Sequence, residues 1–272
     1  MTAQSLVNLE RRPNGVAVLT LSNPPLNLNT LGSIRQINEH CRALAADGSV
    51  RVVVVTGDGD RAFCAGSDIN EFASVRNDVV SKKLAAENRA FTAIEELPQP
   101  VIAALNGVTL GGGAEIALAC DLRIIDETAR IGFPEVKLGV FPGSGGVFRL
   151  PRVVGEGAAR RLLFTGQMID ASEAFRIQLV DEIAPAGKSV ERALELAAEL
   201  ANGPSLALAL IKEGLAGARY ENTREATERT LAASHQVFRG PDIEEGIAAF
   251  FERRPPQFTA ARNETPGKDE GR

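Results

Sequence analysis

Glu115 lies next to a glycine run whose backbone N–H groups could assist a carboxyl in acid–base chemistry. It follows the run Gly111-Gly112-Gly113, which opens an apolar helical pattern that includes Ile116 and Leu118. A helix amino terminus exposes backbone N–H groups and attracts negative charge. The segment therefore offers backbone donors next to a carboxylate. Taken alone, Glu115 fits equally well as a charge that complements the helix dipole.

Glu135 is the second candidate, in the stretch Phe133-Pro134-Glu135-Val136-Lys137-Leu138-Gly139. A lone glutamate in a loop is usually exposed, but this one precedes an apolar position in Gly/Pro-rich sequence, an unusual place for a merely solvated charge. Further along, Ser144 is disfavoured as an acyl-serine nucleophile, because Pro142 occupies the first glycine position of a Gly-x-Ser-x-Gly elbow. Arg149 has either a structural role or an anion partner.

A third segment, Ala62-Phe63-Cys64-Ala65-Gly66-Ser67-Asp68, follows a turn rich in Gly and Asp. Its small residues let the backbone approach another group closely, and the N–H of Ser67 could point at a ligand. Alone, the segment also fits an ordinary strand-to-helix turn. Cys64 has no histidine or other base nearby in sequence, so we interpret it as a small buried hydrophobe rather than a nucleophile.

Several ligand classes lack their patterns in this chain. The glycine run has neither the Gly-x-Gly-x-x-Gly spacing of a dinucleotide site nor the Lys-Ser/Thr pair of a phosphate loop. Three scattered cysteines and two histidines argue against a disulfide framework or a zinc site, so we expect no metal. The net charge is −5, with acidic and basic residues mixed and no Lys/Arg block, which argues against nucleic acid as the main partner.

Hydrophobicity sets the expected environment. With 44% hydrophobic residues the chain has enough apolar surface for a large core. The start, Met1 to Arg12, is polar and lacks the apolar centre of a signal peptide. No apolar run approaches the roughly 18 residues that span a bilayer. We therefore expect no membrane association and a reduced, cytoplasmic environment.

Alternating strands and helices must position the three segments. The apolar patterns predict a strand at 16–21, a helix at 31–46, a buried strand at 52–55, a polar helix around 78–97, and further strands at 101–105, 122–125 and 179–183. Strands in closely spaced pairs between helices indicate an α/β fold built from repeated β-β-α units. From Ser189 to about Arg253 the pattern is helical, with breaks at Gly203-Pro204 and Gly240-Pro241.

The order of the three segments resembles the crotonase, or enoyl-coenzyme A hydratase/isomerase, family. The resemblance covers roughly residues 10 to 262 and extends to Leu162-Leu163-Phe164-Thr165-Gly166, Ala171-Ser172-Glu173-Ala174, Leu179-Val180-Asp181 and Phe250-Phe251-Glu252-Arg253-Arg254-Pro255. It implies a spiral β-β-α core at 1–200 that contains the active site. A helical region at 201–265 for oligomer contacts and a disordered tail at 266–272 would follow.

The resemblance also assigns roles. Two backbone N–H groups, at Ser67 and Gly112, would form an oxyanion hole for an acyl-thioester carbonyl, with Glu115 and Glu135 as the acid/base pair. Glu115 would mainly handle the water and Glu135 the C2 proton. The remaining positions would contact the acyl-CoA substrate, with Phe250 and Arg253 closing on its adenosine end from an adjacent subunit. The predicted substrate-binding residues are Ala65, Gly66, Asp68, Ile69, Gly111, Pro134, Gly143, Phe250 and Arg253.

Hydration of 2-trans-enoyl-CoA at the C2–C3 double bond is the activity that this resemblance implies, without metal or redox cofactor and in a homotrimer or dimer of trimers. The nearest alternative is an enoyl-CoA isomerase or another crotonase-family acyl-CoA reaction. Isomerases usually lack the Glu115-type carboxylate, so the presence of both glutamates favours hydration. A remote alternative is an RNA-binding homologue, for which the helix at 81–95 offers few basic residues. Ser67 replaces a frequent Ala, which should be tolerated because the oxyanion hole needs only the main-chain N–H. The segments at 25–29 and 142–149 also depart from the commonest forms, which leaves the acyl chain length open.

Overall fold

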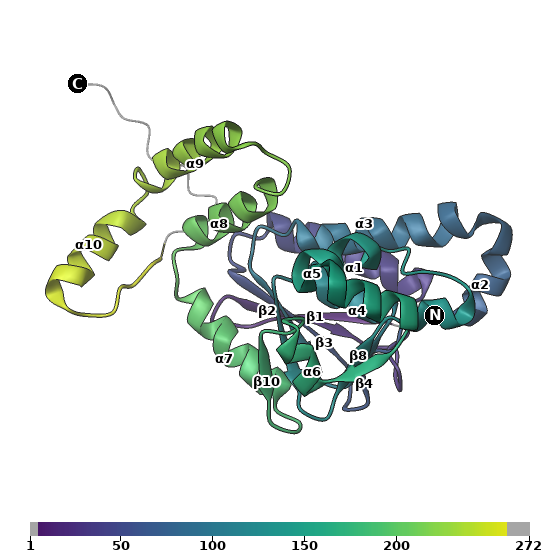
Figure 1. The fold of residues 1–272 in the computed structure, drawn as a ribbon. Helices are drawn as coiled ribbons and strands as arrows, with labels where there is room; N and C mark the ends of the chain where they lie inside the picture. The colour runs from purple at the N-terminus through teal and green to yellow at the C-terminus, as the bar shows by residue number, and fades with distance from the viewer. Residues whose placement is uncertain (1–4, 260–272) are drawn as a thin grey trace.

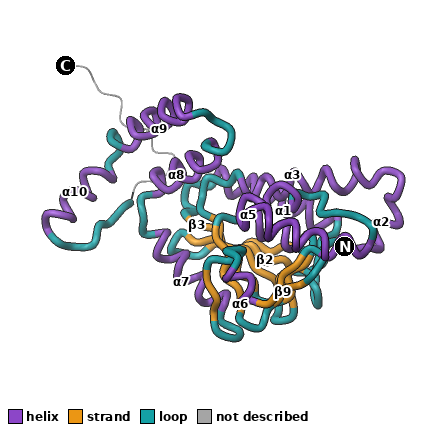
Figure 2. The backbone as a smooth tube through the Cα atoms, viewed as in Figure 1, coloured by secondary structure: helices purple, strands orange, loops and turns teal. Residues whose placement is uncertain are grey.

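The computed structural model describes residues 5–259 as an α/β structure with two sheets (Figures 1 and 2). The strands within this part of the chain are β1 (Val7–Arg11), β2 (Val16–Leu21), β3 (Val52–Gly57), β4 (Ala62–Cys64), β5 (Val101–Leu105), β6 (Val108–Leu110), β7 (Leu122–Asp126), β8 (Arg130–Gly132), β9 (Met168–Asp170) and β10 (Glu182–Ala184). The helices are α1 (Leu31–Ala46), α2 (Ile69–Val75), η1 (Arg76–Asp78), η2 (Val80–Leu84), α3 (Ala85–Glu95), α4 (Gly112–Ala119), η3 (Pro134–Leu138), α5 (Gly146–Thr165), α6 (Ala171–Arg176), α7 (Ser189–Ala201), α8 (Ser205–Gly217), α9 (Thr223–Val237) and α10 (Asp242–Glu252).

The strand pairs β3-β4, β5-β6 and β7-β8 each divide between two sheets, whereas β1 and β2 lie in the same sheet. The larger sheet has the order β1-β2-β3-β5-β7-β10 and the smaller one β4-β6-β8-β9. All neighbours are parallel except β1 with β2 and β8 with β9. The chain thus winds as a spiral that adds one strand to each sheet before it returns through a helix. This confirms the predicted β-β-α repeat.

The central strands are buried on both faces, as their continuous β-branched sequence predicts. Along β3, Val53 and Val55 face the core beneath α1 and α3, whereas Val52 and Val54 face a second core. The second core is completed by small residues of α7, Ala193 and Ala197. Helices therefore cover both faces of the larger sheet. The buried alanines of α7 let this helix pack closely against the strands.

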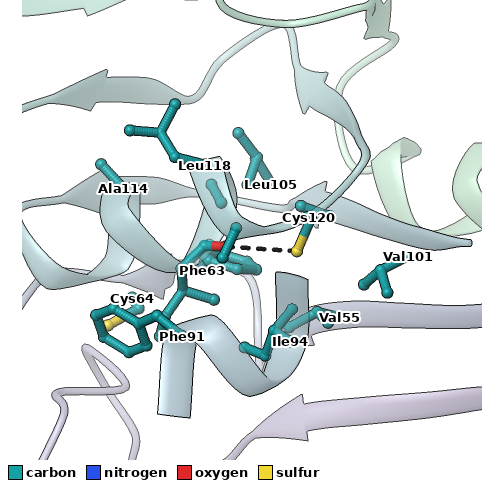
Figure 3. Close-up of a cluster of buried hydrophobic side chains, with 14 of the residues drawn as sticks. Val55, Phe63, Cys64, Phe91, Ile94, Val101, Leu105, Ala114, Leu118 and Cys120 are labelled. Atoms are coloured by element: carbon teal, nitrogen blue, oxygen red, sulfur yellow. Dashed lines mark hydrogen bonds between the residues drawn. The ribbon is translucent and has the colours of Figure 1, made fainter. Parts of the chain in front are cut away.

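The first core also holds the helix that carries Glu115. Figure 3 shows Phe91 and Ile94 of α3 packed near Ala114 and Leu118 of α4. Cys120 lies beside them, and its thiol donates to the carbonyl of Ile116 at 3.4 Å. Burial raises the pKa of the Cys64 thiol, likewise in this core, to about 12. The interpretation of Cys64 as a small hydrophobe is consistent with this position.

Two predicted elements differ from the structure. The strand expected at 179–183 is only Glu182–Ala184, because Leu179 lies in the turn that closes α6, where its N–H donates to Ala174 O at 2.8 Å. Leu179 and Val180 are apolar because they are buried, and burial in a turn gives the same sequence signal as burial in a strand. The helix expected around 78–97 is divided into η1, η2 and α3.

The C-terminal helices extend to one side of the body, with α9 and α10 at its far end (Figure 1). They break at 203–204 and near 240, as predicted, and again between α8 and α9. No single helix among residues 5–259 is long and apolar enough to cross a membrane; α7 and α8 pass that test only as a pair, bent by 109°. The domain boundaries at 200 and 265 stay predictions. The predicted tail at 266–272 lies outside the described residues.

A tight contact between α4 and β4 gives a test of the fold. A Cβ at Gly113 would lie 2.1 Å from the carbonyl oxygen of Cys64, so Gly113→Ala must push α4 away from β4. We expect a loss of unfolding free energy of roughly 1–3 kcal/mol or more, measured by urea unfolding. The control is Gly157→Ala in α5, where a Cβ meets no atom within 4 Å, and it should be neutral or stabilising by up to about 1 kcal/mol. Equal stability of the two variants would contradict the close packing.

Candidate active site

The predicted amide donors lie side by side where α4 begins. A Cβ at Gly112 would lie 3.7 Å from the nitrogen of Ser67 and 3.2 Å from its Oγ. A Cβ at Gly66 would lie 4.0 Å from the nitrogen of Gly112. The loop after β4 and the amino terminus of α4 therefore meet backbone to backbone. A Cβ at Gly112 would also lie 3.0 Å from Asn29 Nδ2, so a larger residue there would shift the Asn29 and Ser67 side chains.

Backbone pairing leaves these two N–H groups available. Asn29 bridges the loop from one side: its N–H donates to Gly66 O and its carbonyl accepts from Asp68 N, both at 2.9 Å. Successive residues of an extended segment point to opposite sides, so the N–H of Ser67 faces away from Asn29. Gly112 is the first residue of α4, where an N–H has no partner within the helix. Within residues 5–259 neither N–H has a protein acceptor.

Glu115 is held one turn into α4 with its carboxylate buried. It is 3% exposed, and its Oε1 accepts from the N–H groups of Ser144 and Gly146, both at 2.8 Å. Burial raises the pKa of Glu115 to about 8, the two N–H donors oppose the rise, and the charges of Glu135 and Glu87 add to it. A carboxyl with this pKa exchanges protons near neutral pH.

Glu135 approaches the same place from η3. Its Oε1 lies 3.2 Å from the position that a Cβ would take at Gly111, whose φ of +52° favours glycine. Its Oε2 is buried without a hydrogen-bond partner among the described residues. Burial raises the pKa of Glu135 as well. Glu135 is therefore not a solvated loop charge, and it is near enough to Glu115 for each charge to affect the other.

Several predicted substrate-binding residues surround these groups as backbone. The N–H of Ala65 donates to Leu26 O at 2.9 Å, and Asp68 caps α2 by accepting from the N–H of Asn70 at 2.9 Å. Ile69, at the start of α2, is 62% exposed. Gly66 and Gly111 line the contact between loop and helix, Pro134 opens η3, and Gly143 O accepts from Asn88 Nδ2 at 2.9 Å.

Phe250 and Arg253 are not brought to this place by the single chain. Phe250 is 78% exposed on α10, and Arg253 ends that helix with a φ of +55°. Figure 1 shows α10 on the far side of α8 and α9 from the body. Their predicted role at the adenosine end requires an adjacent subunit and stays a prediction.

Four polar groups near the site were not predicted. Lys83 and Glu87 are fully buried on η2 and α3, and the hydroxyls of Ser67 and Ser144 both donate to Glu87. The i,i+4 spacing of Lys and Glu and the serines at two unusual positions were the available signals. Arg149 is resolved as structural, because it is buried and pairs with Glu95 at 2.8 Å.

A wide cavity lies elsewhere in the described part of the chain. It has about 900 Å³ and lies between α8 and the body, with Ile211, Lys212 and Leu215 in its wall. None of the four predicted catalytic residues lines it. The position of the amides and carboxylates, rather than cavity size, therefore locates the candidate site.

Comparisons with known proteins identify the family and its fold. The family model described as enoyl-CoA hydratase/isomerase matches residues 11–261. The short-chain-enoyl-CoA hydratase of Clostridium acetobutylicum is 38% identical over 242 residues, 88% of this chain and 92% of the relative. The crotonyl-CoA hydratase of Syntrophomonas wolfei is 35% identical, over 89% of this chain and 94% of the relative. A crystal structure of enoyl-CoA hydratase from Bacillus anthracis superposes with a TM-score of 0.90 at 34% identity, over 93% of this chain and 99% of that one.

Burial of Glu115 predicts a pH-dependent stability. Between the ordinary carboxyl pKa of 4.5 and about 8 the folded chain keeps a proton that the unfolded chain has released, so stability falls as pH rises. Glu115→Gln keeps the Oε1 acceptor and removes the titration. We expect its advantage in unfolding free energy to grow with pH across this window, by up to about 1.4 kcal/mol per pH unit.

Urea unfolding at pH 5, 6.5 and 8 at one protein concentration measures this difference. Glu228→Gln is the control, because that side chain is 65% exposed on α9. Parallel pH curves for Glu115→Gln and the wild type would contradict the raised pKa.

Proposed function

The chain belongs to the enoyl-CoA hydratase/isomerase family, and on that premise we propose that it hydrates 2-trans-enoyl-CoA thioesters. The observation that carries the proposal is the pairing of two unengaged backbone N–H groups, at Ser67 and Gly112, with two carboxyls of raised pKa, the buried Glu115 and the half-buried Glu135. Relatives at 35–38% identity are named hydratases of short-chain enoyl-CoA and crotonyl-CoA.

The two N–H groups would bind the thioester oxygen. Attack of water at C3 moves the electrons of the C2–C3 double bond toward the thioester, so negative charge develops on that oxygen. Preorganised donors stabilise such charge, and one donor is typically worth a factor of roughly 10²–10³ in rate. The amino terminus of α4 adds its positive end at Gly112.

The carboxyls would supply and remove the protons. In its ionised form Glu115 takes a proton from water as the C3–O bond forms, and in its protonated form Glu135 gives a proton to C2. The charge of Glu135 raises the pKa of Glu115, so ionisation of one carboxyl disfavours ionisation of the other. The pair is thus suited to one base and one acid at the same time. The balance needs only water and these two groups, so we propose no metal or redox cofactor.

Isomerisation of an enoyl-CoA remains the second candidate within the family. It moves a proton between two carbons and needs no activated water, so one carboxyl suffices. Glu115 is buried, held by two N–H donors, and adjusted to a pKa near neutral. These features are better explained if Glu115 activates water than if it is a second carboxyl without a role in the reaction.

RNA binding has less support. Lys83, one of the few basic residues of the helix considered for it, is fully buried and pairs with Glu71 at 2.7 Å. We propose acyl-CoA as the partner, without nucleic acid or membrane, in a cytoplasmic homotrimer or dimer of trimers. Large apolar side chains exposed on the C-terminal helices support self-association through that region; they are Leu231, Phe238, Ile247, Phe250 and Phe251.

Loss of the Glu115 carboxylate should stop hydration without preventing binding. For Glu115→Gln with crotonyl-CoA, followed by loss of the enoyl-thioester absorbance, we expect kcat to fall by roughly 10²–10⁴ with KM within a few-fold. Glu228→Gln on α9 serves as the control. Activity of Glu115→Gln within a few-fold of the wild type would refute its role, and no turnover on any 2-trans-enoyl chain length would refute hydration itself.

The two carboxyls should differ in a second reaction. Residual conversion of a 3-enoyl-CoA into a 2-enoyl-CoA needs proton transfer at C2 and no water, so Glu115→Gln should lose hydration at least ten times more strongly than isomerisation. Glu135→Gln should lose both reactions. Chromatography of the product thioesters measures each rate. If Glu135→Gln keeps isomerisation, the assignment of the C2 proton to Glu135 is wrong.

A further inference from the structure

Lys83 and Glu87 form a buried charged pair that the proposed mechanism does not use. They are 0% and 1% exposed, one turn apart on η2 and α3. Taking a charge out of water costs several kcal/mol unless hydrogen bonds and opposite charges compensate it. Apolar side chains of similar volume would fill the space at lower cost. A pair kept in such a place therefore calls for an explanation beyond packing.

Glu87 connects the two loops on which the candidate site depends. Its Oε1 accepts from Ser67 Oγ at 2.7 Å, and its Oε2 accepts from Ser144 Oγ at 2.6 Å. Ser67 carries one of the two unengaged amides, and the N–H of Ser144 donates to Glu115 Oε1. A single carboxylate thus joins the loop of the amide donor to the loop that holds the water-activating glutamate. Bonds from hydroxyls to an ionised carboxylate are among the stronger hydrogen bonds.

Lys83 anchors this connection to a third segment. Its Nζ lies 2.7 Å from Glu71 Oε2, 3.7 Å from Glu87 Oε1 and 3.4 Å from the carbonyl of Asn29. Asn29 is the residue that pairs with the backbone on both sides of Ser67. The Lys83 ammonium therefore balances the charge of Glu87 and holds the backbone of Asn29, which orients the Ser67 amide.

The charge of Glu87 acts within a set of titratable groups. Lys83 faces it from η2, and Glu71 from α2 shares that ammonium. Cys64 of β4 and Glu115 of α4 are close enough for the charge of Glu87 to raise their pKa values, although burial is the larger cause at both. Arg149 of α5 reaches the carbonyl of Ser144 at 3.2 Å.

We propose that Glu87 is a positioning residue, which fixes the Ser67 amide relative to Glu115 by holding Ser67 and Ser144 on its two oxygens. The inference rests on the proposed function for its effect on rate. It concerns reaction rather than affinity, since Glu87 does not belong to the groups expected to contact coenzyme A. Both the geometry and the negative charge matter, and two substitutions separate them.

Glu87→Gln keeps the shape and removes the charge. The amide oxygen accepts from one serine and the amide N–H donates to the other, so the loops stay joined. We expect kcat to fall about 10-fold or less with KM within threefold. Because a negative charge near Glu115 is lost, the acid limb of the kcat profile should move to lower pH, by roughly half a unit or more.

Glu87→Ala removes the connection, and kcat should fall roughly 10²-fold or more, with KM again within threefold. Glu96→Gln, on the exposed end of the same helix, is the matched control and should behave as the wild type. Ser67→Ala and Ser144→Ala each cut one end, so their effects on kcat should not multiply in the double variant, because the second cut removes a link already broken.

Binding of a 3-oxoacyl-CoA separates this inference from the hydration proposal. Its enolate places negative charge on the thioester oxygen, so its affinity reports the amide donors without any turnover. We expect Glu87→Ala to weaken this ligand at least 10-fold and butyryl-CoA, which is saturated, less than threefold, with an unchanged circular dichroism spectrum. If the wild-type protein hydrates no enoyl-CoA, the hydration proposal is refuted. The relative loss of affinity for 3-oxoacyl-CoA and butyryl-CoA in Glu87→Ala still tests the positioning role of Glu87. Equal weakening of both ligands, or wild-type kcat, pH profile and ratio in both variants, would overturn the positioning role.

Discussion

The close approach of α4 to the loop after β4 is the constraint on which the site depends. Gly113 rests against the carbonyl of Cys64 at a distance that leaves no room for a side chain, and Gly112 lies in tight contact with Ser67. These contacts bring the amino terminus of one helix and the N–H of an extended loop to a single point. Because both donors belong to the backbone, their position is set by how strands and helix pack and not by rotamers.

Charges were then buried around that point. Glu115, Glu87 and Lys83 are almost fully enclosed, and each is held by donors or an opposite charge. The cost of enclosing them is offset by hydrogen bonds that also fix their geometry. Burial has a second effect, since it brings the carboxyl of Glu115 into the pH range where it can exchange protons. Burial of Glu115 therefore both fixes its geometry and raises its pKa.

The sequence predicted the elements whose signals are local. Leu31–Ala46 and Val101–Leu105 have the bounds that periodicity indicated, because a regular apolar pattern and a clear stop enclose each. The strand predicted at Leu179–Ile183 is present only as Glu182–Ala184, because burial alone does not distinguish a strand from the turn that precedes it. In the site, the glycine run and the two glutamates were recognisable in order. The connection through Glu87 was not, since its serine partners are 20 and 57 residues away and only the fold brings them together.

The spiral has a consequence for how such a site changes. Successive windings contribute one piece each at the same edge: the loop after β4 the first amide, the start of α4 the second amide with Glu115, and the turn after β8 Glu135. A substitution in one winding can therefore exchange an acid or a base while the two backbone N–H groups at Ser67 and Gly112 stay in place. Changing the residues of one winding at a time could therefore alter the reaction without altering the backbone groups that the other windings contribute. The Glu87 carboxylate limits this freedom, because it accepts from both Ser67 and Ser144 and so couples the loops that carry these two residues.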